Sequence, residues 1–241
     1  MSQGDRQPTL SVVVPVYDEL ENLKPLLERV RSTLDGTGVS WELVAVDDGS
    51  SDGSGERLDE LAVAEPRLRV LHFEANCGQS AALYAGFRHA SGRLVATLDA
   101  DLQVFPEDLP TLLELLESEG VDAVVGIRAA RRDSGWRRFS SRFANQVRNW
   151  LTREDIVDTG CPIKVFRAEA LRELPAFNGM HRFLPTLIRF RGARIRQVPV
   201  RHSPRQSGRS KYGTWDRALR GLRDALGVRW LQDRHLRWEL K

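Results

Sequence analysis

Apolar residues come in five short runs through the first half of the chain, and each run ends in polar or turn-forming residues. The runs are LSVVVPVY (10–17), WELVAVDDGS (41–50), RLRVLHF (67–73), RLVATLDAD (93–101) and VDAVVGIR (121–128). Nearly continuous apolar runs of this length predict strands that are buried on both faces of a sheet.

The segments between these runs carry apolar residues at helical spacing. They predict helices over 22–34, 54–64, 79–90 and 106–119, and the last begins with a proline, which favours the first turn of a helix. Strand and helix alternate throughout, so the sequence predicts an α/β fold with a mostly parallel sheet and helices on both faces. Ligands of such sheets bind at the carboxyl ends of the strands.

The alternation stops after Arg128. An Arg-rich stretch leads into a helical pattern (128–151), a turn leads into a strand (158–167), and alternating residues predict an edge strand (194–202). In the first of these segments one helical face holds Phe139, Phe143, Val147 and Trp150.

The end of the chain predicts a basic amphipathic helix. Its apolar stripe holds Trp215, Leu219, Leu222, Leu226 and Trp230, and Arg217, Arg220 and Arg223 lie off the stripe. Two interpretations are open. The stripe either lies on a bilayer surface, with arginines reaching anionic headgroups, or packs against the rest of the protein.

Three polar residues at alternate positions follow the fourth apolar run: Asp99, Asp101 and Gln103. If the extended conformation continues past Leu98, all three share one face, and two carboxylates that close repel each other unless a cation lies between them. Oxygen ligands suit Mg²⁺ or Mn²⁺. The alternative is that Asp101 caps a turn and Asp99 is solvated.

Two other predicted strand ends are also polar. The first strand ends at Pro15, Tyr17 and Glu19, and the second at Asp47, Asp48, Gly49 and Ser50. The three ends would meet in one crevice, although Asp48-Gly49 also suits a turn and Asp52 or Ser54 a helix cap. No G-x-G-x-x-G or P-loop follows the first strand, which disfavours a dinucleotide oxidoreductase or an NTPase.

The composition is that of a globular protein: 41% of the 241 residues are hydrophobic and 29% are charged. Only two cysteines occur, Cys77 and Cys161, and both are predicted to be inert core thiols in a reducing cytosol. No apolar run approaches the roughly 18 to 20 residues of a spanning helix, and the N-terminus has no secretory signal. The sequence predicts a protein that is soluble or lies on a surface.

The net charge of +3 hides a strong asymmetry. Residues 1–125 carry 9 Lys and Arg against 23 Asp and Glu, a net −14, whereas residues 126–241 carry 27 against 10, a net +17. A basic half of this kind suits nucleic acid, an anionic membrane or phosphorylated substrates. The aromatic residues lie on stripes suited to packing or lipid, so no nucleic-acid partner is predicted.

Six motifs occur between about Leu10 and Gly213: VVVPVYDELENL, VAVDDGSSDGS, NCGQSAALYAG, TLDADLQVFPEDL, DTGCPIKVFR and RQSGRSKYG. In this order and spacing they resemble the inverting family-2 glycosyltransferases, and within these the polyprenyl-phosphate branch, such as dolichyl-phosphate mannosyltransferase and the undecaprenyl-phosphate glycosyltransferases. The resemblance implies a GT-A nucleotide-diphosphosugar-transferase fold. It also implies metal-dependent transfer of a hexosyl group from GDP-mannose or a UDP-hexose to a polyprenyl phosphate.

The resemblance also implies roles for the polar residues at the strand ends. Those that would border the nucleotide base and ribose are Pro15, Tyr17, Glu19 and Asp47. Those that would surround the metal and the donor diphosphate are Asp99, Asp101 and Gln103, of which Asp101 and Gln103 would be the direct ligands.

Four basic residues match positions that contact phosphate in the family. Arg128 and Arg142 would lie at the acceptor phosphate, and Arg205 and Lys211, in a mobile-looking loop, would close on the diphosphate. The expected division is a catalytic domain (1–213), with a nucleotide-sugar half (10–128) and an acceptor half (129–213), followed by the C-terminal segment (214–241). We expect the protein at the cytoplasmic face of the membrane, held peripherally by a surface element or a membrane partner protein.

The chemistry supports this interpretation independently of the family. A phosphate monoester has a second pKa near 6 and is already a nucleophile at pH 7, so no catalytic base is required. The reaction requires a cation for the departing diphosphate and arginines that align the acceptor. The alternatives are a family-2 enzyme with a saccharide acceptor and a nucleotide-sugar-binding protein without turnover.

Overall fold

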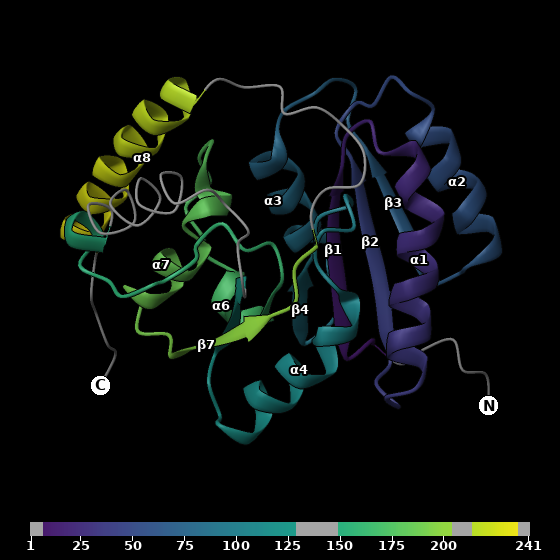
Figure 1. Ribbon diagram of the computed structural model, residues 1–241, viewed down its shortest axis with the longest axis horizontal. Helices are drawn as coiled ribbons and strands as arrows, with labels where there is room; N and C mark the ends of the chain where they lie inside the picture. Colours follow the sequence, from purple (N-terminus) through teal and green to yellow (C-terminus); the bar gives the residue numbers. More distant parts are fainter. Residues whose placement is uncertain (1–6, 129–148, 204–213, 236–241) are drawn as a thin grey trace.

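One seven-stranded sheet organises the protein (Figure 1). The computed structural model describes residues 7–128, 149–203 and 214–235. In chain order the strands are β1 (Leu10–Val16), β2 (Trp41–Asp47), β3 (Leu68–His72), β4 (Leu94–Thr97), β5 (Ala123–Arg128), β6 (Lys164–Arg167) and β7 (Ile195–Val200). Their order across the sheet is β3-β2-β1-β4-β6-β5-β7. Every pair is parallel except those of β6, which runs antiparallel to both β4 and β5.

Helices cover both faces, as the sequence predicts. The helices are α1 (Leu20–Asp35), α2 (Ser54–Ala64), α3 (Gln79–His89), α4 (Leu109–Ser118), α6 (Ala168–Leu171), α7 (Leu184–Arg189) and α8 (Thr214–Arg234), with 3₁₀ turns η2 (Pro106–Asp108) and η3 (Met180–Arg182). The helix predicted over 54–64 has the bounds of α2, and that predicted over 106–119 divides into η2 and α4.

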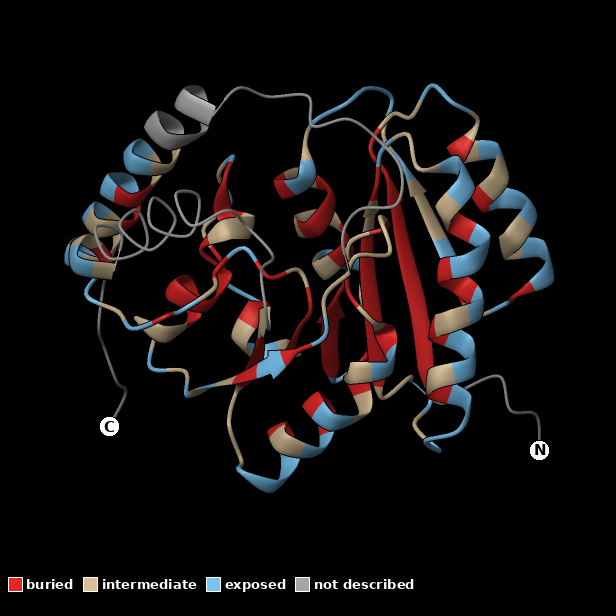
Figure 2. Ribbon diagram, viewed as in Figure 1, coloured by how far each residue is buried: buried red, intermediate tan, exposed pale blue. Residues whose placement is uncertain are grey.

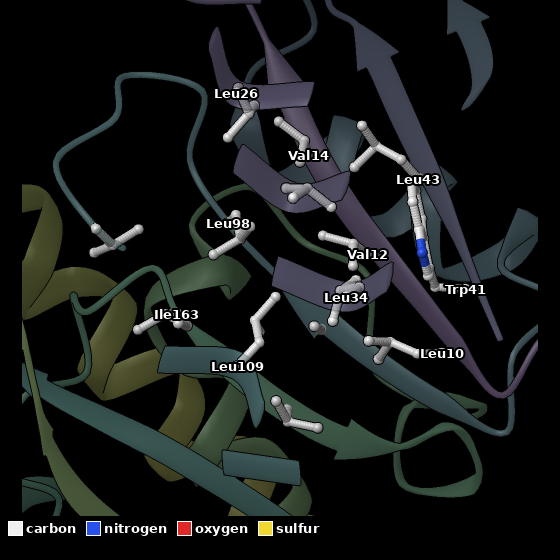
Figure 3. Close-up of a cluster of buried hydrophobic side chains, with 14 of the residues drawn as sticks. Leu10, Val12, Val14, Leu26, Leu34, Trp41, Leu43, Leu98, Leu109 and Ile163 are labelled. Carbon is white, nitrogen blue, oxygen red and sulfur yellow. The ribbon is translucent and has the colours of Figure 1, made fainter. Parts of the chain in front are cut away.

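The alternation of side chains along β1 builds two cores, one on each face of the sheet. Val12 and Val14 join a cluster with the apolar faces of α1 and α4, whereas Val13 joins a second cluster with α3, α6, α7 and α8. Figure 3 shows the first cluster, in which Leu26 and Leu34 of α1 meet β1. Strands buried on both faces are the reason that their sequences are continuously apolar.

The second half of the chain completes the sheet rather than forming a sheet of its own. Strand β6 inserts between β4 and β5, and β7 forms the edge beyond β5. Residues from both halves of the sequence therefore meet along the β4–β6 pair. Among the described residues, none of the helices is long and apolar enough to cross a membrane.

Helix α3 approaches the sheet closely at Gly86. A methyl group at this position would collide with Cγ1 of Val13 on β1. Gly227 on α8 differs, because a methyl group there would meet no atom within 4 Å.

We expect Gly86→Ala to lower the free energy of unfolding by about 1–3 kcal/mol, because the core must shift to admit the methyl group. Gly227→Ala is the matched control and should leave stability unchanged or raise it by up to ~1 kcal/mol through helix propensity. Urea denaturation measures both. Equal stability of Gly86→Ala and the parent protein would show that α3 can move away from β1.

Candidate functional site

A turn at the carboxyl end of β4 holds the acidic motif. The strand ends at Thr97, and Leu102 lies in the left-handed region with φ 57°. The extended conformation therefore does not continue through Asp101, and the condition under which Asp99, Asp101 and Gln103 would share one face of a strand is not met. Asp101 Oδ1 accepts a hydrogen bond from the Gln103 amide N–H at 3.2 Å, so Asp101 caps a turn as the alternative interpretation held, but Asp99 is partly buried rather than solvated.

The turn nevertheless leaves Asp99 beside a second negative charge. Burial and, next, the charge of Asp101 raise the pKa of the Asp99 carboxyl to about 6, although Lys164 and Arg128 oppose the rise. Asp99 Oδ1 also accepts a hydrogen bond from Gln79 Nε2 at 2.9 Å. The first turn of α3 thus orients one carboxylate of the pair.

These residues suit a hard divalent cation by their chemistry. Carboxylate and amide oxygens, which Asp99, Asp101 and Gln103 carry, are the ligands that Mg²⁺ and Mn²⁺ favour. Among residues 7–128, 149–203 and 214–235, no group of three His, Cys, Asp or Glu side chains is placed to hold a metal ion.

Arg128 ends β5 on the same side of the sheet. Its Nε and Nη2 donate to the two carboxylate oxygens of Asp158 at 2.7 and 2.8 Å. This bidentate pair fixes the guanidinium while leaving Nη1 available to a ligand. Asp158 has no role among the sequence predictions, although it lies in the DTGCPIKVFR motif.

Lys164 is a buried cation that the sequence analysis also missed. It begins β6 opposite Thr97 of β4, and its ammonium donates to the carbonyl of Cys161. Burial lowers the pKa of the Lys164 ammonium, and the nearby Cys161 and Asp99 oppose that shift. A charged residue at the start of an apolar strand was the signal that could have identified it.

The two aspartates at the end of β2, Asp47 as its last residue and Asp48 directly after it, hold loops together. Asp47 Oδ1 accepts from the Ser50 amide at 3.0 Å, and its Oδ2 is 3.1 Å from Nδ1 of His72 on β3. Asp48 accepts from the amides of Cys77 and Gly78 at 2.7 and 2.8 Å. Both carboxylates are buried.

Gly49 allows these loops to approach each other. Its φ is +68°, and a Cβ there would lie 2.6 Å from the carbonyl carbon of Ala75. The turn interpretation of Asp48-Gly49 is therefore confirmed. Neither Asp52 nor Ser54 is the N-cap of α2, which is Gly53, but Asp52 accepts from the first amides of α2 and α1, those of Ser54 and Leu20, at 2.9 and 3.1 Å.

His72 bridges two acidic residues beside this loop. Its Nε2 is 3.1 Å from Asp59 Oδ1 of α2, opposite the contact with Asp47. Burial alone would lower the pKa of His72, but the hydrogen bonds to Asp47 and Asp59 outweigh it, and the pKa is raised.

The end of β1 lies next to Asp47 because β1 and β2 are paired. Pro15 pairs with Val46 and Val16 with Asp47. Tyr17 follows the strand and is exposed. Glu19 Oε2 accepts from Asn22 Nδ2 at 2.5 Å, so Glu19 helps to hold the start of α1.

The remaining basic residues of the expected site are Arg142, Arg205 and Lys211, which lie outside the described residues. The chain that leads to the last two is fixed at the acidic turn. Val104 forms an antiparallel bridge with His202, and the Ser203 amide donates to the Gln103 carbonyl at 2.8 Å. Residues 204–213 therefore follow directly from a position beside Gln103.

The two cysteines differ from each other. Cys161 is buried, and burial raises the pKa of its thiol to about 11, which makes it inert. Cys77 is exposed in the loop held by Asp48, so the expectation of an inert core thiol is wrong there. A loop that closes over Gly49 carries Cys77 at the surface instead of in the core.

Comparisons with known proteins agree with this architecture. Residues 11–175 match the model of Glycosyl transferase family 2. An undecaprenyl-phosphate 4-deoxy-4-formamido-L-arabinose transferase from Edwardsiella ictaluri is 41% identical over 85% of this chain and 63% of its own length. A dodecaprenyl-phosphate galacturonate synthase from Rhizobium johnstonii is 37% identical over 91% of this chain and 66% of its own.

The chain thus spans slightly less than two thirds of the length of these relatives. Among solved structures, glucosyl-3-phosphoglycerate synthase from Mycobacterium tuberculosis, in complex with Mn²⁺, UDP-glucose and phosphoglyceric acid, is similar in fold. Its TM-score is 0.68 at 20% identity, and the match covers 93% of this chain and 79% of that one. The family match spans the sheet from β1 through β6, and the chain belongs to glycosyltransferase family 2.

Proposed function

We propose that the protein transfers a sugar from a nucleotide sugar to a polyprenyl phosphate with inversion at the sugar carbon. The observation that carries the proposal is the pair Asp99 and Asp101 at the carboxyl end of β4, in a chain whose relatives are named for undecaprenyl and dodecaprenyl phosphate. The proposed donor is GDP-mannose or a UDP-hexose, which makes the transferred group a hexosyl group.

The proposal includes a divalent cation, Mg²⁺ or Mn²⁺, at the acidic turn. Asp101 and Gln103 would be its ligands, and Asp99 would lie beside it. When bound, the cation would supply Lewis-acid stabilisation of the departing diphosphate. Gln79 orients the Asp99 carboxylate, and Lys164 and Arg128 limit the negative charge around it.

The nucleotide would lie along the ends of β1 and β2. Pro15, Tyr17, Glu19 and Asp47 are the residues proposed to border the base and ribose. The pairing of β1 with β2 supports this assignment, because it brings the Pro15 end of β1 beside Asp47.

The acceptor phosphate would approach from the second half of the chain. Arg128 and Arg142 are proposed to align it, and Arg205 and Lys211 to close on the diphosphate. The pairing of Arg128 with Asp158 supports this assignment. Asp158 fixes the guanidinium through Nε and Nη2, so this pair leaves Nη1 for the acceptor phosphate. On this proposal residues 10–128 bind the donor and residues 129–213 the acceptor, within the catalytic domain 1–213. A phosphate acceptor needs no catalytic base.

An acceptor with an isoprenoid tail places the reaction at a membrane. We propose a peripheral protein at the cytoplasmic face of the membrane, held by its own surface or by a membrane partner protein. The strongly basic second half of the sequence supports attraction to an anionic surface.

The direct test is incubation of the pure protein with a panel of nucleotide sugars, polyprenyl phosphate and Mg²⁺ or Mn²⁺, with mass analysis of the lipid. We expect a lipid-linked sugar that is absent without the lipid phosphate.

Asp101→Asn should lower turnover by roughly two orders of magnitude, as when one transition-state stabiliser is lost. Glu114→Gln, an exposed change on α4, is the control. Normal turnover of Asp101→Asn with EDTA present would overturn the metal assignment.

A second prediction tests the contact between His72 and Asp47. A raised pKa means that the folded protein holds the His72 proton more tightly than the unfolded chain does. This contribution to stability is fully present below the ordinary pKa of about 6.5 and is lost as pH rises through the raised value. The free energy of unfolding of the parent protein minus that of His72→Gln should therefore be constant below about pH 6.5 and fall as the pH rises above it.

Denaturation in urea at a series of pH values measures this difference. Titrating groups that do not contact His72, Asp99 among them, are present in both proteins, so their contributions to the pH dependence cancel in the difference. A difference that stays constant across the series would show that the contact does not favour protonated His72.

A further inference from the structure

The outer face of α8 carries a row of exposed apolar side chains. The helix packs on the rest of the protein through Ala225 and Val228, which are buried in the second core cluster. Leu222, Leu226 and Trp230, one turn apart on the helix, are 44%, 53% and 62% exposed. The described part of the stripe therefore does not pack against the protein, and Figure 2 shows exposed positions along the helix.

Trp150 is a further exposed apolar side chain, near the C-terminal part of α8. Gln232 Nε2 of α8 donates to the Thr152 carbonyl at 2.9 Å, which holds the two segments together. Trp150 is 78% exposed, and with Arg229 it lines an open hollow of about 740 Å³. We define the docking face as Trp150, Leu222, Leu226 and Trp230.

This concentration of apolar side chains is unusual for the molecule. Eight large apolar residues are exposed among the described residues, and four of them form the docking face. A concentration of exposed apolar side chains marks an interaction site more often than scattered single residues do.

Arginines surround the docking face. Arg153, Arg223 and Arg234 are exposed and have no acidic partner in the described part of the chain. Two acidic residues of α8 are already paired with arginines. Asp224 lies 3.7 Å from Arg182, and Asp233 lies 3.0 Å from Arg229.

We propose that the docking face binds the surface of an anionic bilayer, an inference that rests on the proposed function because that function needs a lipid acceptor. Tryptophan and leucine side chains enter the headgroup boundary, and the arginines reach anionic headgroups. A second copy of the chain fits this face less well, because a symmetric contact would bring the arginine rims together.

The opposite side of α8 fixes the docking face relative to the proposed site. Asp224 contacts Gly179, whose φ of +101° and lack of a side chain allow the approach. The Gly179 amide donates to Ser80 Oγ at 2.9 Å, and Ser80 follows Gln79, which holds Asp99. Docking through α8 would therefore hold the acidic turn in a fixed orientation to the bilayer.

Cosedimentation with vesicles tests the proposal. The probes are vesicles of phosphatidylcholine alone and with about one part in four of phosphatidylglycerol. The parent protein should bind the anionic vesicles at low salt and release at high salt, because screening removes the attraction of the arginines. Equal binding to both vesicles, or none to either, would overturn the proposal.

Two variants separate the contributions. The triple variant Leu222→Gln, Leu226→Gln and Trp230→Gln should lower vesicle partitioning roughly 100-fold or more, because it removes three apolar side chains that would be buried in the bilayer. Arg223→Gln with Arg234→Gln should lower it on the order of tenfold, and only on anionic vesicles. The control is Val63→Gln with Val157→Gln, which removes two exposed valines elsewhere and should change nothing.

Circular dichroism and light scattering verify that each variant is folded and report its oligomeric state. A folded triple variant that sediments with vesicles like the parent protein would contradict the proposal. A parent dimer that becomes a monomer in the triple variant, without vesicle binding, would assign the face to a second copy.

Turnover measured in vesicles and in detergent distinguishes a failure of the docking proposal from a failure of the proposed function. The triple variant should lose activity on polyprenyl phosphate in vesicles but keep it on the same lipid dispersed in detergent. Loss in both formats would contradict a docking role, since detergent removes the need for a surface. A parent protein that binds anionic vesicles but shows no transfer in either format would overturn the proposed function and leave the docking proposal supported.

Discussion

The site is built around one unfavourable contact, the repulsion between Asp99 and Asp101 where β4 ends. Burial and the neighbouring charge together raise the pKa of Asp99 to about 6, so the folded chain bears a cost that protonation of Asp99, nearby positive charge or a bound cation would lower. The surrounding residues suit that constraint. Gln79 donates to Asp99 from the first turn of α3, and Lys164 and Arg128 approach from the other half of the sheet.

The antiparallel strand β6 explains how an acidic half and a basic half form one site. Because β6 inserts between β4 and β5, Lys164 pairs across from Thr97, two residues before Asp99. The same segment carries Asp158, which fixes the Arg128 guanidinium at the end of β5. Acidic residues from the first half of the sequence and basic residues from the second half therefore lie close together in the fold.

The repeating elements of the fold could be predicted from the sequence, because strands buried on two faces and helices with one apolar face leave simple patterns. The turn after β4 could not, since the left-handed conformation of Leu102 has no such pattern. The sequence does not reveal three further polar residues, because each interacts with a partner that is distant in sequence. His72 contacts Asp47, Asp158 pairs with Arg128, and the charge of Lys164 acts on Asp99. The exposure of the α8 stripe was likewise undecided, since an amphipathic pattern does not reveal which face meets the protein.

The claim on which the account depends is that the acidic turn binds a nucleoside diphosphate through a divalent cation. Calorimetric titration of UDP and GDP into the protein, with Mn²⁺ and with EDTA, tests it most directly. The account predicts that one of the two nucleotides binds with Mn²⁺, that EDTA abolishes its binding, and that Asp101→Asn abolishes it as well. Binding of equal affinity in EDTA, or undiminished binding to Asp101→Asn, would contradict it.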